Sequence, residues 1–175
     1  HRTGQHFSEL GVVDHGDVRT WDDVAAYLDY LTSTLREVVW NDGVPLLLGG
    51  EHTVSLAGAR AVEPDVFVCC DAHLDLYDAY DGNPLSHAAV TRRILEDVDS
   101  VEEAIILGAR TGSEAEWERT RADDVTVVPP EAVPDWDPGN RLPDREVYLS
   151  VDIDAADPGF APGTGTTEPF GLEPR

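Results

Sequence analysis

The segment Asp65-Val-Phe-Val-Cys-Cys70, followed directly by Asp71-Ala-His-Leu-Asp75, is the clearest indication of the fold. Its first six residues are expected to form a strand that is apolar on both faces, which is typical of a parallel sheet covered by helices on each side. The polar residues come where that strand ends. Ligands of open parallel sheets bind beyond the carboxyl ends of the strands, so a polar site is expected there.

Apolar segments and helical patterns alternate along the rest of the chain. Between Trp21 and Trp40 apolar residues recur at helical spacing, and Thr20 with Asp23 provides a cap. Further helices are expected over 53–61, 88–96 and 113–121, further strands over 44–48, 104–107, 125–128 and 146–151, and a surface loop over the proline-rich residues 129–143. The alternation predicts one α/β domain over residues 1–175, a three-layer α/β/α sandwich on a mainly parallel sheet.

The charge of the chain is strongly negative. It carries 35 acidic residues against 12 basic ones, all of them arginine, for a formal net charge of −23. This acidity repels nucleic-acid phosphates and anionic membranes, so neither is expected as a partner. Distributed acidity without lysine is typical of a halophilic surface, because high salt screens the self-repulsion. An acidic protein of an ordinary cytosol is the alternative.

Localisation and cysteine chemistry follow from two simpler observations. No apolar run approaches the ~20 residues needed to cross a bilayer, and the first residues form no apolar signal segment, so a cytoplasmic protein is expected. Cys69 and Cys70 are the two cysteines of the chain. Neighbouring cysteines rarely reach the geometry of a mutual disulfide, so both are interpreted as buried small apolar residues in a reducing compartment.

Three polar motifs each follow a predicted strand. They are Gly49-Gly-Glu-His52, Asp71-Ala-His-Leu-Asp75 and Asp152-Ile-Asp154. Alternate residues of extended backbone point to the same side, so the carboxylates and imidazole of the second motif should face one point, as should the two carboxylates of the third. With His52 the three motifs supply four carboxylates and two imidazoles.

Such a cluster needs cations. Four converging carboxylates repel one another and take up protons unless positive charge neutralises them. Six ligands exceed what one ion usually takes from a protein, so two divalent ions that share bridging carboxylates are expected. Oxygen-rich ligands with some nitrogen suit Mn²⁺. Each motif alone is common in turns or at solvated strand ends; their joint placement at strand ends predicts the metal site.

The same motifs resemble those of a known family. Gly-Gly-Glu-His-Thr-Val-Ser (49–55), Asp-Ala-His-Leu-Asp-Leu-Tyr-Asp (71–78) and Ser-Val-Asp-Ile-Asp-Ala-Ala-Asp-Pro (150–158) resemble the ureohydrolase family of arginases and agmatinases, and residues 162–166 with Glu168 continue its third signature. The resemblance implies an arginase-like fold, two Mn²⁺ ions per chain, a small guanidino substrate, and a homo-oligomer of three or six chains. It also implies two ligand sets, which are His52, Asp71, Asp75 and Asp152 for one ion and Asp71, His73, Asp152 and Asp154 for the other.

The resemblance further implies hydrolysis that releases urea. Two ions lower the pKa of a shared water, and the resulting hydroxide attacks the guanidinium carbon. Asp154 would steady the tetrahedral intermediate. His87 matches the family's proton-shuttling histidine, which would protonate the leaving amine. A surface-loop histidine is the alternative interpretation of His87.

Agmatine, which would give putrescine and urea, is the expected substrate. Asp78 and Asp81, if they face the pocket, would attract the ammonium of agmatine and repel the α-carboxylate of arginine. Asn83 and Glu168 are further substrate-binding candidates. The alternatives are other guanidino compounds (the substrates of arginase, guanidinobutyrase or formimidoylglutamase), a non-catalytic metal-binding relative, and a deacetylase-like single-metal hydrolase.

Two departures from the family pattern bear on activity. Thr166-Thr-Glu168 replaces the family's Thr-Pro-Glu. Family members also continue past the position of Arg175 with a glutamate that holds the guanidinium, and the domain is expected to be incomplete at both ends. Residues 1–175 alone are therefore expected to bind metal weakly and to release no urea.

Overall fold

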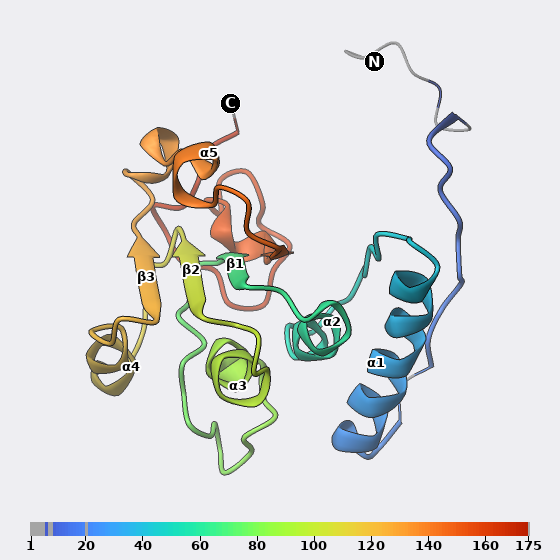
Figure 1. Ribbon diagram of the computed structural model, residues 1–175. Helices are drawn as coiled ribbons and strands as arrows, with labels where there is room; N and C mark the ends of the chain where they lie inside the picture. The colour runs from blue at the N-terminus through green and yellow to red at the C-terminus, as the bar shows by residue number, and fades with distance from the viewer. Residues whose placement is uncertain (1–5, 7–8, 20, 175) are drawn as a thin grey trace.

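Four parallel strands form one sheet in the order β3-β2-β1-β4, with helices packed around it (Figure 1). The computed structural model describes residue 6 and residues 9–19 and 21–174. The strands are β1 (Val66–Cys70), β2 (Glu103–Leu107), β3 (Val125–Val128) and β4 (Val147–Val151). The α-helices are α1 (Val24–Trp40), α2 (Val54–Val62), α3 (Val90–Asp97), α4 (Glu114–Arg119) and α5 (Pro138–Arg141), and the short 3₁₀ helices are η2 (His87–Ala89), η3 (Val133–Asp135) and η4 (Ile153–Ala155).

The register of the sheet brings the carboxyl ends of its central strands to one edge. Cys70, the last residue of β1, pairs with Leu107 of β2 and with Val151 of β4. One further hydrogen bond continues the ladder on each side. The N–H of Asp71 donates to the Leu107 carbonyl at 3.1 Å, and the N–H of Asp152 donates to the Cys70 carbonyl at 2.8 Å. Two of the three polar motifs therefore begin side by side.

Both faces of the sheet are covered, which confirms the α/β/α architecture. On one face Phe67 and Cys69 belong to a core shared with α1, α2 and α3. On the other face Val66 and Val68 lie in a core against which Trp136 packs. Residues 129–143, expected to be only a surface loop, thus contain η3 and α5 and cover this second face (Figure 1).

Helix α1 forms where the apolar spacing predicts it. The Asp23 side chain caps its start by accepting a hydrogen bond from the Ala26 N–H at 3.0 Å. Leu28, Leu31 and Leu35 form its buried stripe. The proposed contribution of Thr20 to the cap lies outside the described residues. Within the described part of the chain, no helix combines the length and apolar character needed to cross a membrane.

The prediction of a strand over 44–48 is wrong. Within the described residues these positions form no strand, and Val44, Leu46 and Leu48 are 94%, 83% and 86% exposed. A strand exists only through hydrogen bonds to a neighbouring strand. β4 is the last strand at its edge of the sheet, and the described residues place no further strand beyond it with which residues 44–48 could pair. Consequently Gly49–His52 does not follow a strand and leads instead into α2.

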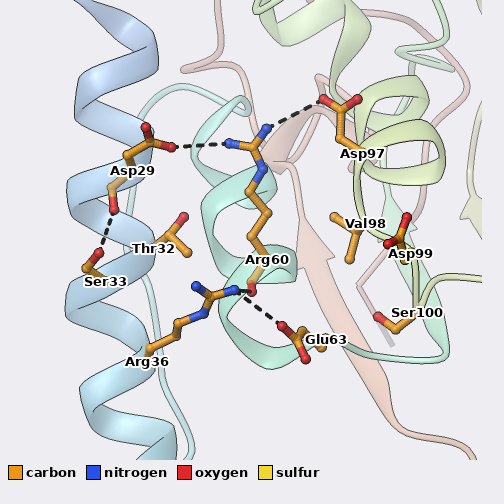
Figure 2. Close-up of a pocket in the computed structure, with 10 residues that line it drawn as sticks. All are labelled: Asp29, Thr32, Ser33, Arg36, Arg60, Glu63, Asp97, Val98, Asp99 and Ser100. Atoms are coloured by element: carbon orange, nitrogen blue, oxygen red, sulfur yellow. Dashed lines mark hydrogen bonds and ion pairs between the residues drawn. The ribbon is translucent and has the colours of Figure 1, made fainter.

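A polar cavity of about 810 Å³ lies between α1, α2 and α3, away from the carboxyl edge of the sheet (Figure 2). Arg60 of α2 extends between Asp29 of α1, at 3.8 Å, and Asp97 of α3, at 3.5 Å. Arg36 of α1 contacts Glu63, just after α2, at 3.3 Å. Since both arginines are already paired with carboxylates, we interpret this region as an ion-pair network that joins three helices.

Candidate metal centre

The three polar motifs meet in one cavity of about 690 Å³ at the carboxyl edge of the sheet. Its lining includes all six predicted metal ligands, which are His52, Asp71, His73, Asp75, Asp152 and Asp154. The expectation that they converge is met. The local backbone that achieves it differs from the extended geometry expected above.

The motif after β1 bends instead of continuing as a strand. Asp71 Oδ1 accepts a hydrogen bond from the N–H of His73 at 2.7 Å, which closes a tight turn. Asp75 then takes a left-handed conformation, with φ of 51°. Backbone strain of this kind persists when surrounding contacts enforce it, and it concentrates at functional sites. The bend returns the 71–75 segment toward the cavity.

The motif after β4 also leaves the extended conformation, because Asp154 lies within η4. Asp152 caps this helix by accepting a hydrogen bond from the Asp154 N–H at 3.1 Å. Asp154 Oδ1 accepts from the Ala72 N–H at 3.0 Å, and Oδ2 accepts from the Thr166 hydroxyl at 3.2 Å. Asp154 thereby joins the ends of β1 and β4 and fixes its own carboxylate.

His52 is placed by the beginning of α2, where it precedes the N-cap residue Thr53. Its Nδ1 lies 2.8 Å from Asp75 Oδ2 and 3.1 Å from Asp71 Oδ2. The His52 side chain is only 7% exposed. It therefore meets the Asp71 motif in a water-poor environment.

Asp71 faces two histidines with different oxygens. Its Oδ2 faces His52, and its Oδ1 lies 3.4 Å from His73 Nδ1, which is also 3.1 Å from Asp154 Oδ2. Two groups of donor atoms result, each within 4.8 Å, and they are His52 with Cys69 and Asp71, and Asp71 with His73 and Asp154. Asp75 and Asp152 line the same cavity but belong to neither group.

The electrostatics of the cluster show that it requires positive charge. Burial raises the pKa of Asp75 to about 6 and also raises the pKa of Asp152. Burial acts in the same direction on Asp71, but hydrogen bonds from His52 and His73 outweigh it and hold the Asp71 pKa below its usual range. Hydrogen bonds to Asp154 and Asp71 raise the pKa of His73 to about 10. Protonated imidazole balances the carboxylates here, so the donor set fits divalent cations.

Cys69 lies closer to the cluster than its sequence interpretation implied. Its Sγ is 3.6 Å from His52 Nε2 and 3.7 Å from Asp71 Oδ2. Alternation along β1 places Cys69 on the same side as Asp71, and that signal was available in the sequence. Burial raises the pKa of the Cys69 thiol, so the group stays neutral and packs as a small apolar residue. Cys69 and Cys70 are both free thiols.

His87 lies at the rim of the cavity, at the start of η2. Its side chain is 53% exposed, and its Nδ1 is 3.5 Å from Glu51 Oε1. The ring centroids of His87 and Tyr80 are 5.9 Å apart, and Tyr80 packs edge-on against Tyr77. Both tyrosines line the cavity, although the sequence analysis gave them no role.

The three predicted substrate-binding residues are not part of the cavity lining. Asp78 lies 3.5 Å from Arg92 and 3.2 Å from Arg93, so its charge is already balanced. The Asn83 side chain accepts a hydrogen bond from the Leu85 N–H within its own loop. The backbone carbonyl of Glu168 accepts from Arg110 at 2.7 Å.

A buried carboxylate that sequence reasoning missed also reaches the cavity. Glu116 is 3% exposed and accepts hydrogen bonds from the N–H groups of Leu76 and Ser113. It forms the capping box of α4 with Ser113, and the Ser-x-x-Glu spacing at 113–116 was its sequence signal. Glu116 thus ties α4 to the segment that follows Asp75.

Fold and site together define an α/β protein with an acidic histidine–carboxylate cluster at the carboxyl edge of a parallel sheet. The profile of the arginase family matches residues 1–175, and the chain belongs to this family. It is 38% identical to the N(1)-aminopropylagmatine ureohydrolase of Thermococcus kodakarensis, over 94% of this chain and 58% of that protein. It is 34% identical to the agmatinase of Pyrococcus horikoshii, over 94% of this chain and 59% of that one.

The structural comparison agrees. The crystal structure of the agmatine ureohydrolase of Thermoplasma volcanium matches with a TM-score of 0.81 at 34% identity, covering 93% of this chain and 57% of that one. The chain thus spans about three-fifths of the length of these relatives.

Proposed function

We propose that this chain provides the dimanganese centre of a ureohydrolase that converts agmatine to putrescine and urea. The observation that carries the proposal is that the two oxygens of Asp71 face two different histidines. A carboxylate shared in this way suits two neighbouring divalent ions. We propose the two ligand sets that the family resemblance implies, His52, Asp71, Asp75 and Asp152 for one ion and Asp71, His73, Asp152 and Asp154 for the other.

The charge of the cavity supports agmatine over arginine. Within the described part of the chain its lining contains six carboxylates and no arginine. The α-carboxylate of arginine would find no arginine or lysine side chain there to pair with, whereas the ammonium of agmatine would be attracted by the carboxylates. The names of the Thermococcus and Pyrococcus relatives point to the same class of guanidino amines.

The residues of the chain would divide the work of hydrolysis. Two Mn²⁺ ions, when bound, would supply a water of lowered pKa as the nucleophile. Asp154, held by the Ala72 N–H and the Thr166 hydroxyl, would accept a hydrogen bond from the tetrahedral intermediate. His87 at the rim would donate a proton to the leaving amine, and Tyr80 beside it offers a ring face to a cation.

Asp78, Asn83 and Glu168 remain part of the proposal only as outer residues, because they lie beyond the cavity lining. We also propose a homo-oligomer of three or six chains, for which the family resemblance is the support, and a cytoplasmic location.

The test measures urea released by the Mn²⁺-loaded protein produced from its complete reading frame. We expect kcat/KM for agmatine to exceed that for arginine and guanidinobutyrate by at least about tenfold; N(1)-aminopropylagmatine is assayed beside them. Asp71→Asn should abolish the activity, and Arg121→Gln, a change at a surface position, is the matched control. A preference for arginine contradicts the substrate assignment. Two bound ions without urea from any guanidino compound would instead indicate a non-catalytic metal-binding relative.

A further inference from the structure

The imidazole of His52 is hydrogen-bonded on both of its nitrogens. Nδ1 faces Asp71 and Asp75 in the cavity, whereas Nε2 lies 3.0 Å from the hydroxyl of Ser150 on β4. Ser150 is 9% exposed, so no bulk water competes for this contact. The side of the ring that faces away from the metal cluster therefore has a built partner.

The contact continues through further hydroxyl groups. Ser150 Oγ lies 3.1 Å from the Oγ of Ser55 on α2, which is 5% exposed. The phenol of Tyr148, two residues before Ser150 on the same face of β4, lies beside Ser55. Burial raises the pKa of Tyr148 and so keeps this phenol protonated. A buried chain of hydroxyls thus links His52 to the interface between α2 and β4.

Gly58 shows that Tyr148, at the far end of the chain of hydroxyls, packs tightly against α2. A Cβ at position 58 would lie 2.2 Å from the Tyr148 hydroxyl oxygen and 2.5 Å from its ring carbons. Only a residue without a side chain lets the tyrosine lie across α2 at this point. The position of the Tyr148 phenol, and through it that of Ser55, is therefore set by the packing of α2 on β4.

The chain of hydroxyls determines which imidazole nitrogen is available. A histidine that binds metal through one nitrogen carries its proton on the other, and the acceptor of that proton orients the ring. Ser150 can accept from Nε2–H because its own proton can be donated to Ser55. We propose that Ser150 and Ser55 are positioning residues of the metal centre, which keep the proton of His52 on Nε2 and direct Nδ1 toward the metal. This inference rests on the proposed function, since it requires a metal ion at the cluster.

Ser150→Ala is the main test, with Mn²⁺ affinity measured by titration calorimetry. We expect the affinity of one ion to fall about 10–100-fold, as is usual when the outer partner of a ligating histidine is removed. The second ion should change much less, because the contacts of His73 are with Asp71 and Asp154. Ser55→Ala should give a smaller loss in the same direction, and Ser150→Thr, which keeps the hydroxyl, should retain the affinity.

Thr32→Val is the matched control. Thr32 is also a buried hydroxyl that contacts α2, through the Ala57 carbonyl at 3.4 Å, but it lies outside this chain of hydroxyls. Its replacement should leave both affinities unchanged. A second measurement is the ¹H–¹⁵N NMR spectrum of the protein loaded with diamagnetic Zn²⁺. We expect a slowly exchanging proton on Nε2 of His52 in the wild type, and its loss in Ser150→Ala.

The outcomes separate this inference from the proposed function. Wild-type protein that binds no Mn²⁺ contradicts the proposed function. Wild-type protein that binds Mn²⁺, together with Ser150→Ala that keeps the same affinity and the same Nε2 proton, overturns the positioning role alone. If circular dichroism shows Ser150→Ala to be unfolded, the Mn²⁺ affinities of Ser55→Ala and Ser150→Thr test the positioning role instead. An affinity of Ser55→Ala equal to that of the wild type would then count against this role.

Discussion

His73 and Asp154 lie at the ends of neighbouring strands and face each other, with 3.1 Å between His73 Nδ1 and Asp154 Oδ2. This hydrogen bond is the main reason that the pKa of His73 rises to about 10. A metal ion that takes Nδ1 must therefore displace a proton throughout the neutral range. Metal binding at His73, as proposed, would therefore be coupled to pH.

We predict that Mn²⁺ affinity rises with pH between 6 and 9, by up to about tenfold per unit for each proton displaced. Calorimetry in buffers of different ionisation enthalpy would count the protons released when Mn²⁺ binds. The His73→Asn variant should release about one proton fewer than the wild type. The stability of the metal-free fold depends on pH in the opposite direction. The folded pKa of His73 lies above its ordinary value of 6.5, so its stabilisation is full below pH 6.5 and is lost as the pH rises through about 10. Affinity that is flat across this range contradicts the prediction.

The ligand variants should differ in how many ions they lose. Asp71→Asn keeps the shape of the side chain but removes the charge shared by both histidines, so we expect it to disturb both ions. His52→Ala should mainly empty one. Asp152→Asn is the discriminating variant. If Asp152 bridges the two ions, as proposed, its replacement should lower the occupancy of both. In the structure its carboxylate caps η4, and a residue with that role alone could be replaced without loss of either ion. Metal content by elemental analysis decides, and full occupancy in Asp152→Asn would rule out bridging by this residue.

Much of this centre was predictable because its determinants are local. The strands around 66–70, 104–107, 125–128 and 147–151 are apolar on both faces, and that pattern alone located them within one residue. Parallel strands in register then bring Asp71 and Asp152 together at the same edge. The convergence of these side chains thus follows from strand pattern and sheet geometry.

The remaining features depend on contacts between distant segments. The left-handed Asp75 and the η4 turn are held by hydrogen bonds across the site, and neither changes the apolar pattern. Residues 44–48 have the pattern of a buried strand, but pairing needs a neighbour that local sequence does not reveal. Asp78 was expected near the substrate from its charge and its place in the loop after the 71–75 motif, whereas its pairing with Arg93 depends on how α3 packs.

His87→Ala should lower the turnover of agmatine about 10²–10⁴-fold, the usual contribution of a proton-transfer group. The metal content should not change, because His87 lies at the cavity rim and outside both groups of ligand atoms. Steady-state kinetics across pH, with metal analysis of the same samples, provide the measurement. His15→Ala, at another exposed histidine, is the control. An unchanged pH–rate profile would return His87 to the role of a surface-loop histidine.

Dissolved salt should stabilise the folded protein. A net charge of −23 repels itself across the folded surface, and several arginines, such as Arg60 and Arg119, are already paired with carboxylates. The excess acidity must therefore be relieved by dissolved cations, whose screening length falls from about 10 Å at 0.1 M to about 3 Å at 1 M. We expect the Tm of the Mn²⁺-saturated protein to rise when KCl is increased from 0.1 to 2 M. Replacing the exposed Asp17 and Asp22 by asparagine should reduce this dependence, because the repulsion that salt relieves is then smaller. Thermal melts of both proteins at a series of salt concentrations test the idea, and a higher Tm at low salt would show that the acidity serves another purpose.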